Sequence, residues 1–139
     1  PFLQVVLSHF LLVPIVIGTI DLDVCRRIGN KIAEALNDEK RNYIIIISTD
    51  LSHYYHYDIA KKIDTNFIEA LKKFDENYLY EMLQSDKAQA CGEGPVLAGI
   101  VGSKKLGAKR VEILHYANSG DTAGPKNEVV GYLAAAFVK

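Results

Sequence analysis

Residues 43–55 read YIIIISTDLSHYY, an apolar run followed directly by a polar stretch. Every side chain from residue 43 to residue 47 is large and apolar, as in a strand that is covered on both faces. We therefore predict a central β-strand over residues 43–47, packed between two layers. In open α/β sheets, ligands bind beyond the carboxyl ends of the strands. The polar residues from 48 onward are therefore the first place to look for a functional site.

Working outward, hydrophobic periodicity predicts four helices and three further strands. Asp21 can cap the first helix. The predicted helices cover residues 24–36, 59–74, 78–83 and 94–105. The predicted strands cover residues 11–17, 111–116 and 129–138, with a turn-rich segment at 118–126. This alternation predicts a single α/β domain over residues 1–139, a sandwich with helices on both faces of a mixed, mainly parallel sheet.

The composition is that of an ordinary globular domain, with 49% apolar and 24% charged residues. A net charge of −1, with basic and acidic residues interleaved, argues against a nucleic-acid partner. The apolar run at 11–17 is far shorter than the ~20 residues of a membrane span, and we expect no membrane partner. Two distant cysteines predict no disulfide framework, so we expect a cytoplasmic protein. The chain starts at Pro1 within an apolar pattern, and we expect sequence to precede it.

The polar stretch brings a carboxylate, a hydroxyl, an imidazole and a phenol into a few residues: Asp50, Ser52, His53 and Tyr54. One interpretation is that Asp50 and Ser52 cap the next helix while His53 is a half-buried loop residue. The other is that these side chains line a pocket. Spacing alone leaves both interpretations open, because single motifs have high false-positive rates.

Cys91 lies in ACGEGP, residues 90–95, just before a predicted helix. A helix N-terminus favours a negative charge, which suits a thiolate that binds a metal or acts as a nucleophile. The alternative is a small buried apolar residue, as most lone cysteines are. Cys25 fits that alternative best, because it lies on the apolar side of the first predicted helix.

The other three histidines are expected to be exposed or structural residues. His56 is three residues from His53 and can share a helical face with it, as chelating pairs do, but we expect an exposed position near a helix start. His9 and His115 stand alone, one before an apolar segment and one inside another. We interpret both as structural residues.

Several motifs follow one another in the chain: STDLSHY at 48–54, ACGEGP at 90–95, YANSGD at 116–121 and VGY at 130–132. PFLQ at 1–4 and VPIVIG at 13–18 fit the same pattern. Together they resemble the Memo family over essentially the whole chain, and their order is far more specific than any single motif. The likeness is to the C-terminal half of such proteins, so we expect the N-terminal half to be missing here.

The resemblance implies a fold similar to class III extradiol dioxygenases and a pocket metal held by two histidines and a cysteine. Cys91 matches the ligand cysteine and His53 matches an additional pocket histidine. The two ligand histidines belong to segments upstream of Pro1. The transition metal, iron, copper or zinc, would therefore have an incomplete site in this chain. We expect Asp50 to orient His53, with the pocket rim formed by Tyr54, Ser119 and Asp121.

Three functions remain in view. The first is a metal-dependent oxidoreductase-type enzyme of unknown substrate, with His53 as general acid or base. The alternative is a non-catalytic peptide- or anion-binding module, a signalling or modification-system adaptor whose pocket is rimmed by Tyr54, Tyr55 and Tyr57. The third is a metal-independent thiol enzyme that uses Cys91 as its nucleophile. The resemblance also implies an association with radical-SAM and AMMECR-type proteins.

Overall fold

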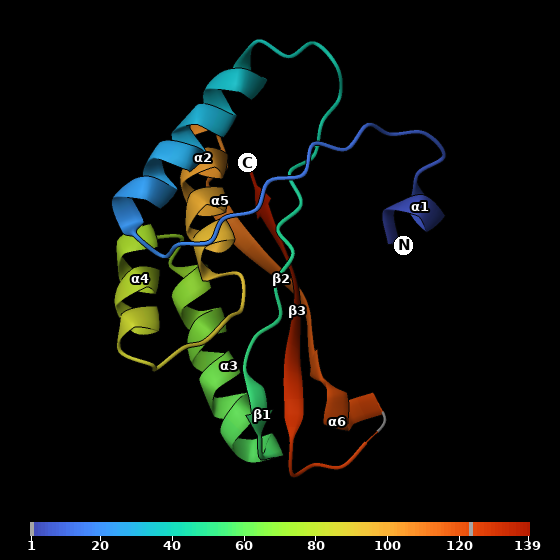
Figure 1. The fold of residues 1–139 in the computed structure, drawn as a ribbon, viewed down its shortest axis with the longest axis vertical. Coiled ribbons are helices and arrows are strands. Elements are labelled where there is room, and N and C mark those ends of the chain that lie inside the picture. The colour runs from blue at the N-terminus through green and yellow to red at the C-terminus, as the bar shows by residue number, and fades with distance from the viewer. Residues whose placement is uncertain (1, 123) are drawn as a thin grey trace.

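Helices and short strands follow one another through residues 2–122 and 124–139, which are the residues that the computed structural model describes (Figure 1). Pro1 and Ala123, the second of which falls in the predicted turn 118–126, lie outside the described residues. The helices are α1 (Phe2–Val6), α2 (Leu22–Asn37), α3 (Tyr57–Lys72), α4 (Glu76–Gln84), α5 (Glu93–Lys105) and α6 (Ser119–Thr122). The strands are β1 (His53–Tyr55), β2 (Arg110–Asn118) and β3 (Val129–Val138).

The four helices predicted from periodicity are confirmed as α2, α3, α4 and α5. Their ends follow local chemistry. The Asp21 carboxylate accepts the Val24 N–H at 2.8 Å, and the Asp75 carboxylate accepts the Asn77 N–H at 2.8 Å, so both side chains satisfy free amides of a first turn. After α5, Gly107 has a φ of 97°, the left-handed conformation that ends helices and that glycine adopts without strain. These signals are local, which is why the sequence predicts them.

The sheet has the order β1-β3-β2, and both pairs of strands are antiparallel. The prediction of a mixed α/β chain is confirmed, but the mainly parallel sheet is not found in the described residues. Residues 119–128 join β2 to β3 and turn the chain back on itself, so that Arg110 pairs with Val138 and Asn118 with Gly131. A parallel pair would need a crossover of a dozen or more residues.

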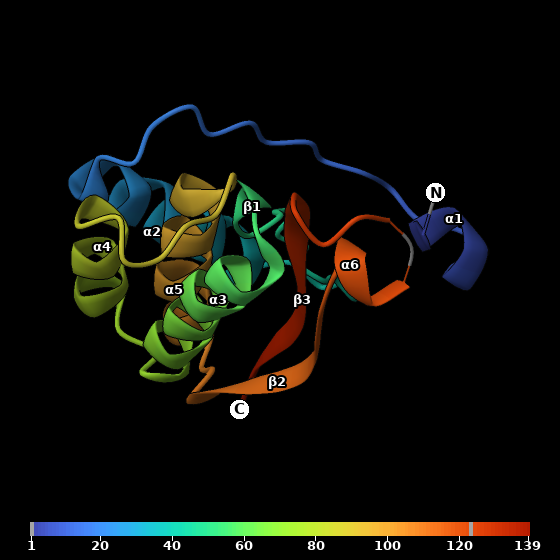
Figure 2. The same ribbon diagram turned by 90° about the horizontal axis from the view of Figure 1, so that it is seen from below.

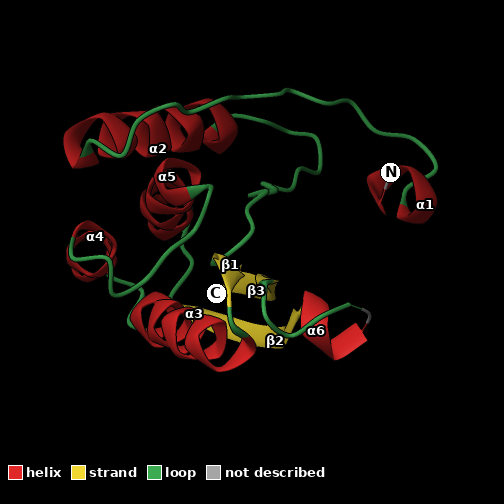
Figure 3. Cartoon of the chain, turned by 60° about the horizontal axis from the view of Figure 1, so that its bottom comes forward, coloured by secondary structure: helices red, strands yellow, loops and turns green. Residues whose placement is uncertain are grey.

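Two predicted strands, 11–17 and 43–47, are extended but belong to no sheet in the part of the chain that is described. A strand exists only where a neighbour pairs its backbone, and sequence pattern cannot tell whether that neighbour is present. The predicted cover on both faces is also not found among residues 2–122 and 124–139. Ile44 and Ile46 are exposed, and α2–α5 all lie to one side of the strands (Figures 2 and 3).

The hydrophobic core lies within this helical layer and between it and the sheet. Its fully buried members include Phe67, Leu79, Leu97 and Ile100. Helices α2 and α5 cross closely because Gly29 and Gly102 face each other, and a Cβ at Gly29 would overlap the Ala98 carbonyl oxygen. None of the described helices combines the length and the apolar character needed to cross a membrane.

The Gly29 crossing gives the first prediction. We expect Gly29→Ala to lower the free energy of unfolding by about 2 kcal/mol, because the backbone oxygen of Ala98 cannot move aside as a side chain could. Gly18→Ala is the control, since a Cβ there meets nothing within 4 Å, and its effect should stay within about 0.5 kcal/mol. Urea unfolding measures both. Equal stabilities for the two variants would contradict the close crossing.

Candidate functional site

Cys91 is bound to the segment that precedes β1. The Asp50 N–H donates to the Cys91 sulfur at 3.1 Å, and the Cys91 N–H donates to the Asp50 carbonyl at 3.0 Å. The Thr49 hydroxyl lies 3.7 Å from the same sulfur. This reciprocal contact joins the residues after the extended segment to the residues before α5, and it holds an exposed thiol in a defined position.

Gly92 makes this close approach possible. Its N–H donates to the Thr49 hydroxyl oxygen at 2.7 Å, and a Cβ on it would lie 2.7 Å from the Thr49 Cβ. Real Cβ atoms do not come so close, so a larger residue would push the α5 end away from residue 49. Packing against Thr49 therefore requires glycine at position 92, which also lies directly before α5.

His53 lies near the side chain of the same residue, Asp50. Its Nε2 lies 3.8 Å from the Asp50 Oδ2, and about a third of the His53 side chain is exposed. This separation suits an ion pair with a protonated imidazole but is too long for a hydrogen bond. The structure thus places both Cys91 and His53 close to Asp50. The hydrogen bond by which Asp50 would orient His53 is not formed here. Their catalytic and ligand roles stay predictions.

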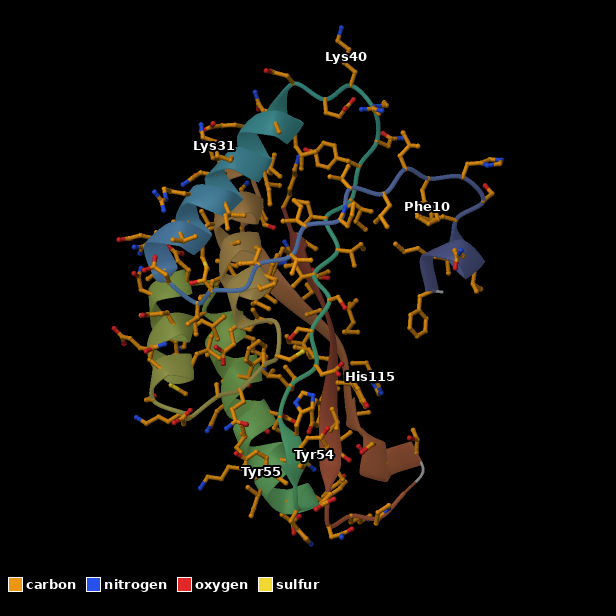
Figure 4. All side chains as sticks on the ribbon, in the orientation of Figure 1. Phe10, Lys31, Lys40, Tyr54, Tyr55 and His115 are labelled. Atoms are coloured by element: carbon orange, nitrogen blue, oxygen red, sulfur yellow. The ribbon has the colours of Figure 1, made fainter. Side chains whose placement is uncertain are left out.

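Tyr54 bends the chain beside this cluster. It has a φ of 63°, and the register of β1 against β3 shifts at the same residue. Left-handed backbone is uncommon in a residue with a large side chain, and bulges of this kind turn neighbouring side chains to new directions. Tyr54 is largely exposed, with its ring centroid 5.7 Å from that of His53 and the two ring planes inclined by 60°, while the Tyr55 hydroxyl accepts a hydrogen bond from Gln89 at 3.0 Å (Figure 4). Tyr54 is therefore an exposed residue beside His53, and its place on a pocket rim stays a prediction.

The other two predicted rim residues have structural partners. The Ser119 hydroxyl accepts the Val130 N–H at 3.1 Å, and the Asp121 carboxylate accepts the Asn118 N–H at 2.8 Å and the Tyr57 hydroxyl at 2.6 Å. The hydrogen bond from the Asn118 backbone N–H is the main reason that the pKa of Asp121 is lowered. Both side chains fix the connection between β2 and β3. Within the described residues, no hydrogen bond links either of them to His53 or Cys91.

Sequence reasoning missed Asp64, a fully buried carboxylate in α3 that lies beneath the site. It accepts the Ser52 N–H at 3.0 Å and the Tyr116 hydroxyl at 2.7 Å. A Cβ at Gly131 would overlap the carboxylate, so β3 can pass here only with glycine. Asp64 therefore fixes the backbone of the residue before His53 and ties α3 to two strands.

Burial raises the pKa of Tyr116, and its hydrogen bond to Asp64 raises it further. Two more buried polar atoms belong to Ser52 and to Asn118. The Ser52 hydroxyl oxygen and the Asn118 amide nitrogen have no hydrogen-bond partner among the described residues. The signal for Asp64 was available, because it falls on the same helical face as Ala60, Phe67 and Leu71, all of which are buried.

The remaining candidates lie elsewhere. Cys25 is fully buried in α2, and burial raises the pKa of its thiol, which confirms the expected core residue. His56 precedes α3 with its side chain more than half exposed, as expected. His9 and His115 are exposed, and Figure 4 shows His115 on the side of the sheet away from α2–α5. Neither belongs to the cluster around Asp50.

A transition metal places two requirements on the donor set: the kind of ligand and the number of ligands. Thiolate and imidazole are ligands that iron, copper and zinc accept, so the chemistry fits in kind. It does not fit in number, because no three His, Cys, Asp or Glu side chains of residues 2–122 and 124–139 converge closely enough to hold a metal. These residues by themselves form at most part of a metal site.

Comparison with known proteins matches the chain to the family described as Memo-like protein over residues 1–136. A MEMO1 family protein of Methanosarcina mazei is 39% identical over 135 residues, which cover 96% of this chain and 51% of the relative. A MEMO1 family protein of Methanopyrus kandleri is 39% identical over 138 residues, covering 99% and 49%. One of Saccharolobus solfataricus is 37% identical over 139 residues, covering 99% and 49%. The chain spans about half the length of the curated relatives it matches.

The buried carboxylate gives the second prediction. We expect Tyr116→Phe to destabilise the fold by about 2 kcal/mol, because it removes one of the two hydrogen bonds to Asp64 where water cannot replace it. Tyr132→Phe, on β3 and half exposed, is the matched control and should change stability by less than about 0.5 kcal/mol. Urea unfolding at neutral pH compares them. A neutral Tyr116→Phe would show that Asp64 does not depend on this donor.

Proposed function

Because this chain belongs to the Memo-like protein family, we propose that Asp50, His53 and Cys91 form part of a metal-centred pocket with metal-dependent oxidoreductase-type activity. The observation that carries the proposal is that Asp50 contacts both residues, the Cys91 sulfur through its backbone N–H at 3.1 Å and the His53 imidazole through its carboxylate at 3.8 Å. The substrate is a small molecule of unknown identity. We also propose that the complete domain has a fold similar to class III extradiol dioxygenases.

Cys91 is proposed as the metal ligand that this chain contributes. Its sulfur accepts a hydrogen bond from the Asp50 N–H, and cysteine sulfur is a ligand that iron, copper and zinc bind. The same backbone contact fixes the direction of the sulfur, so little conformational freedom is lost when a metal binds. A cysteine in place of a carboxylate is a softer ligand, which favours iron, copper or zinc over magnesium or calcium.

His53 is proposed as the general acid or base. It is partly exposed, so a proton can be exchanged with substrate or solvent, and the Asp50 carboxylate lies 3.8 Å from its Nε2. Hydrogen bonds of this type are often long without substrate and shorten in the reacting complex, so 3.8 Å is compatible with the role. The Asp64 contact with the Ser52 amide keeps the neighbouring backbone in place.

The missing ligands define what else the pocket needs. Catalytic sites of this class use three protein ligands and leave a further position open. We propose that the remaining ligands are histidines supplied by polypeptide outside residues 1–139. Partnership with radical-SAM and AMMECR-type proteins is also part of the proposal, as is a cytoplasmic location.

A second candidate function is a non-catalytic module that binds a peptide or an anion at the same place. The exposed ring of Tyr54, turned outward by its left-handed backbone, favours this candidate because it offers a recognition surface beside His53. The two candidates differ in the part of Cys91. Inorganic phosphate that binds equally well to the native chain and to Cys91→Ser in chelator would favour the module.

Titration with Co²⁺ gives the third prediction. The reduced chain should bind Co²⁺ weakly and develop thiolate-to-cobalt charge-transfer absorption, and Cys91→Ser should abolish that absorption. Cys25→Ser is the matched control and should leave it unchanged, because Cys25 is buried in α2. Absorption that persists in Cys91→Ser, or that never develops in the native chain, would contradict the proposed ligand.

A further inference from the structure

His53 follows an irregularity in the sheet. The two residues before it, Leu51 and Ser52, share one partner on β3. The Leu51 N–H donates to the Gly131 carbonyl at 2.9 Å, and the Gly131 N–H donates to the Ser52 carbonyl at 3.0 Å. Two residues opposite one is the arrangement of a β-bulge, which bends its strand and turns side chains to a new direction. The direction of His53 therefore depends on the geometry of this bulge.

One backbone donor of the bulge bonds to a helix and not to β3. The Ser52 N–H donates to the Asp64 carboxylate of α3 at 3.0 Å. Ser52 is fully buried, and a buried N–H needs a partner because water cannot reach it. The Ser52 hydroxyl oxygen has no hydrogen-bond partner among the described residues, so its own side chain does not supply the acceptor. Asp64 is therefore the group that satisfies the bulge.

The Asp64 carboxylate is held from three elements. Its second oxygen accepts the Tyr116 hydroxyl of β2 at 2.7 Å. It also lies against Gly131 of β3, where a Cβ would overlap it. The side chain is fully buried on the face of α3 that also carries Phe67. The acceptor for the Ser52 N–H is thus presented in one defined position.

The same helix supports the segment that leads to Cys91. The Asn66 side-chain amide of α3 donates to the Lys87 carbonyl at 2.9 Å, in the connection between α4 and α5. Cys91, at the end of that connection, contacts Asp50, the residue directly before the bulge. Helix α3 is therefore a common support for the bulge before His53 and for the loop before Cys91.

We propose that Asp64 is a positioning residue for His53. By accepting the Ser52 N–H it holds the bulge, and the bulge sets the direction in which the His53 imidazole leaves the sheet toward Asp50. Asp64 is fully buried, so it acts through the Ser52 backbone and not on a substrate. The use of this arrangement in catalysis rests on the proposed function, in which His53 is the general acid or base, whereas the geometry itself needs no metal.

The fourth prediction separates positioning from stability. In the intact protein in metal chelator, NMR should show nuclear Overhauser contacts between the His53 ring and the Asp50 side chain, because Nε2 and Oδ2 lie 3.8 Å apart. Asp64→Ala removes the acceptor without adding bulk and should abolish these contacts. Asp64→Asn should retain them, because its oxygen can accept the Ser52 N–H. Tyr116→Phe is the matched control, since it removes only the other hydrogen bond to Asp64 and should lower stability while the contacts remain.

A second variant covers the case in which Asp64→Ala does not fold. Gly131→Ala displaces the carboxylate through its Cβ and should also abolish the His53 contacts. In the native protein, the Ser52 N–H should exchange slowly with solvent. The proposal is overturned if the contacts persist in folded Asp64→Ala or Gly131→Ala, if Tyr116→Phe or Asp64→Asn abolishes them, or if the Ser52 N–H exchanges as fast as exposed amides.

The NMR measurement also distinguishes this proposal from the proposed function. Because it is made in chelator, it does not depend on a bound metal. The expected contacts without Co²⁺ absorption would remove the ligand role of Cys91 and leave the positioning role of Asp64 intact. Contacts that persist in folded Asp64→Ala, together with the expected Co²⁺ absorption, would remove the positioning role and leave the metal site.

Discussion

The reciprocal contact between Asp50 and Cys91 is the constraint on which the candidate site depends. It links two residues that are 41 positions apart in the chain through one backbone hydrogen bond and one N–H hydrogen bond to sulfur. The contact requires glycine at position 92, because any larger residue would collide with Thr49. Without it, the thiol before α5 and the imidazole of β1 would have no fixed relation, and the polar motifs would be separate loops.

A second constraint lies below the first. Asp64 is a carboxylate without solvent, and burial of such a group is costly unless hydrogen bonds satisfy it. The Ser52 N–H, just before β1, and the Tyr116 hydroxyl, on β2, donate these hydrogen bonds. A buried polar network with specific geometry therefore lies next to His53, where α3, β2 and the residue before β1 meet.

The sequence predicted those parts of the fold that depend on neighbours along the chain. Helices α2 to α5 follow from periodicity and caps, and β3 from its apolar run. The predicted strands at 11–17 and 43–47 are not formed in the described residues because pairing is a tertiary property, and the mixed, mainly parallel sheet is not found there because a short connection reverses β2 into β3. Asp50, His53 and Cys91 were proposed from local motifs and a family resemblance, and their roles stay predictions. Asp64 was missed because a single acidic residue in a helix is usually exposed.

The most direct test of the central claim is disulfide trapping of the junction between residue 49 and Cys91. In a Cys25→Ala background, Thr49→Cys places a second sulfur where the Thr49 hydroxyl lies 3.7 Å from the Cys91 sulfur, within reach of a disulfide after small adjustment. Mild oxidation should remove both free thiols, while Ser48→Cys, whose side chain points to the opposite face of the extended segment, should keep them. Two free thiols in oxidised Thr49→Cys, or equal cross-linking of both variants, would contradict the site described here.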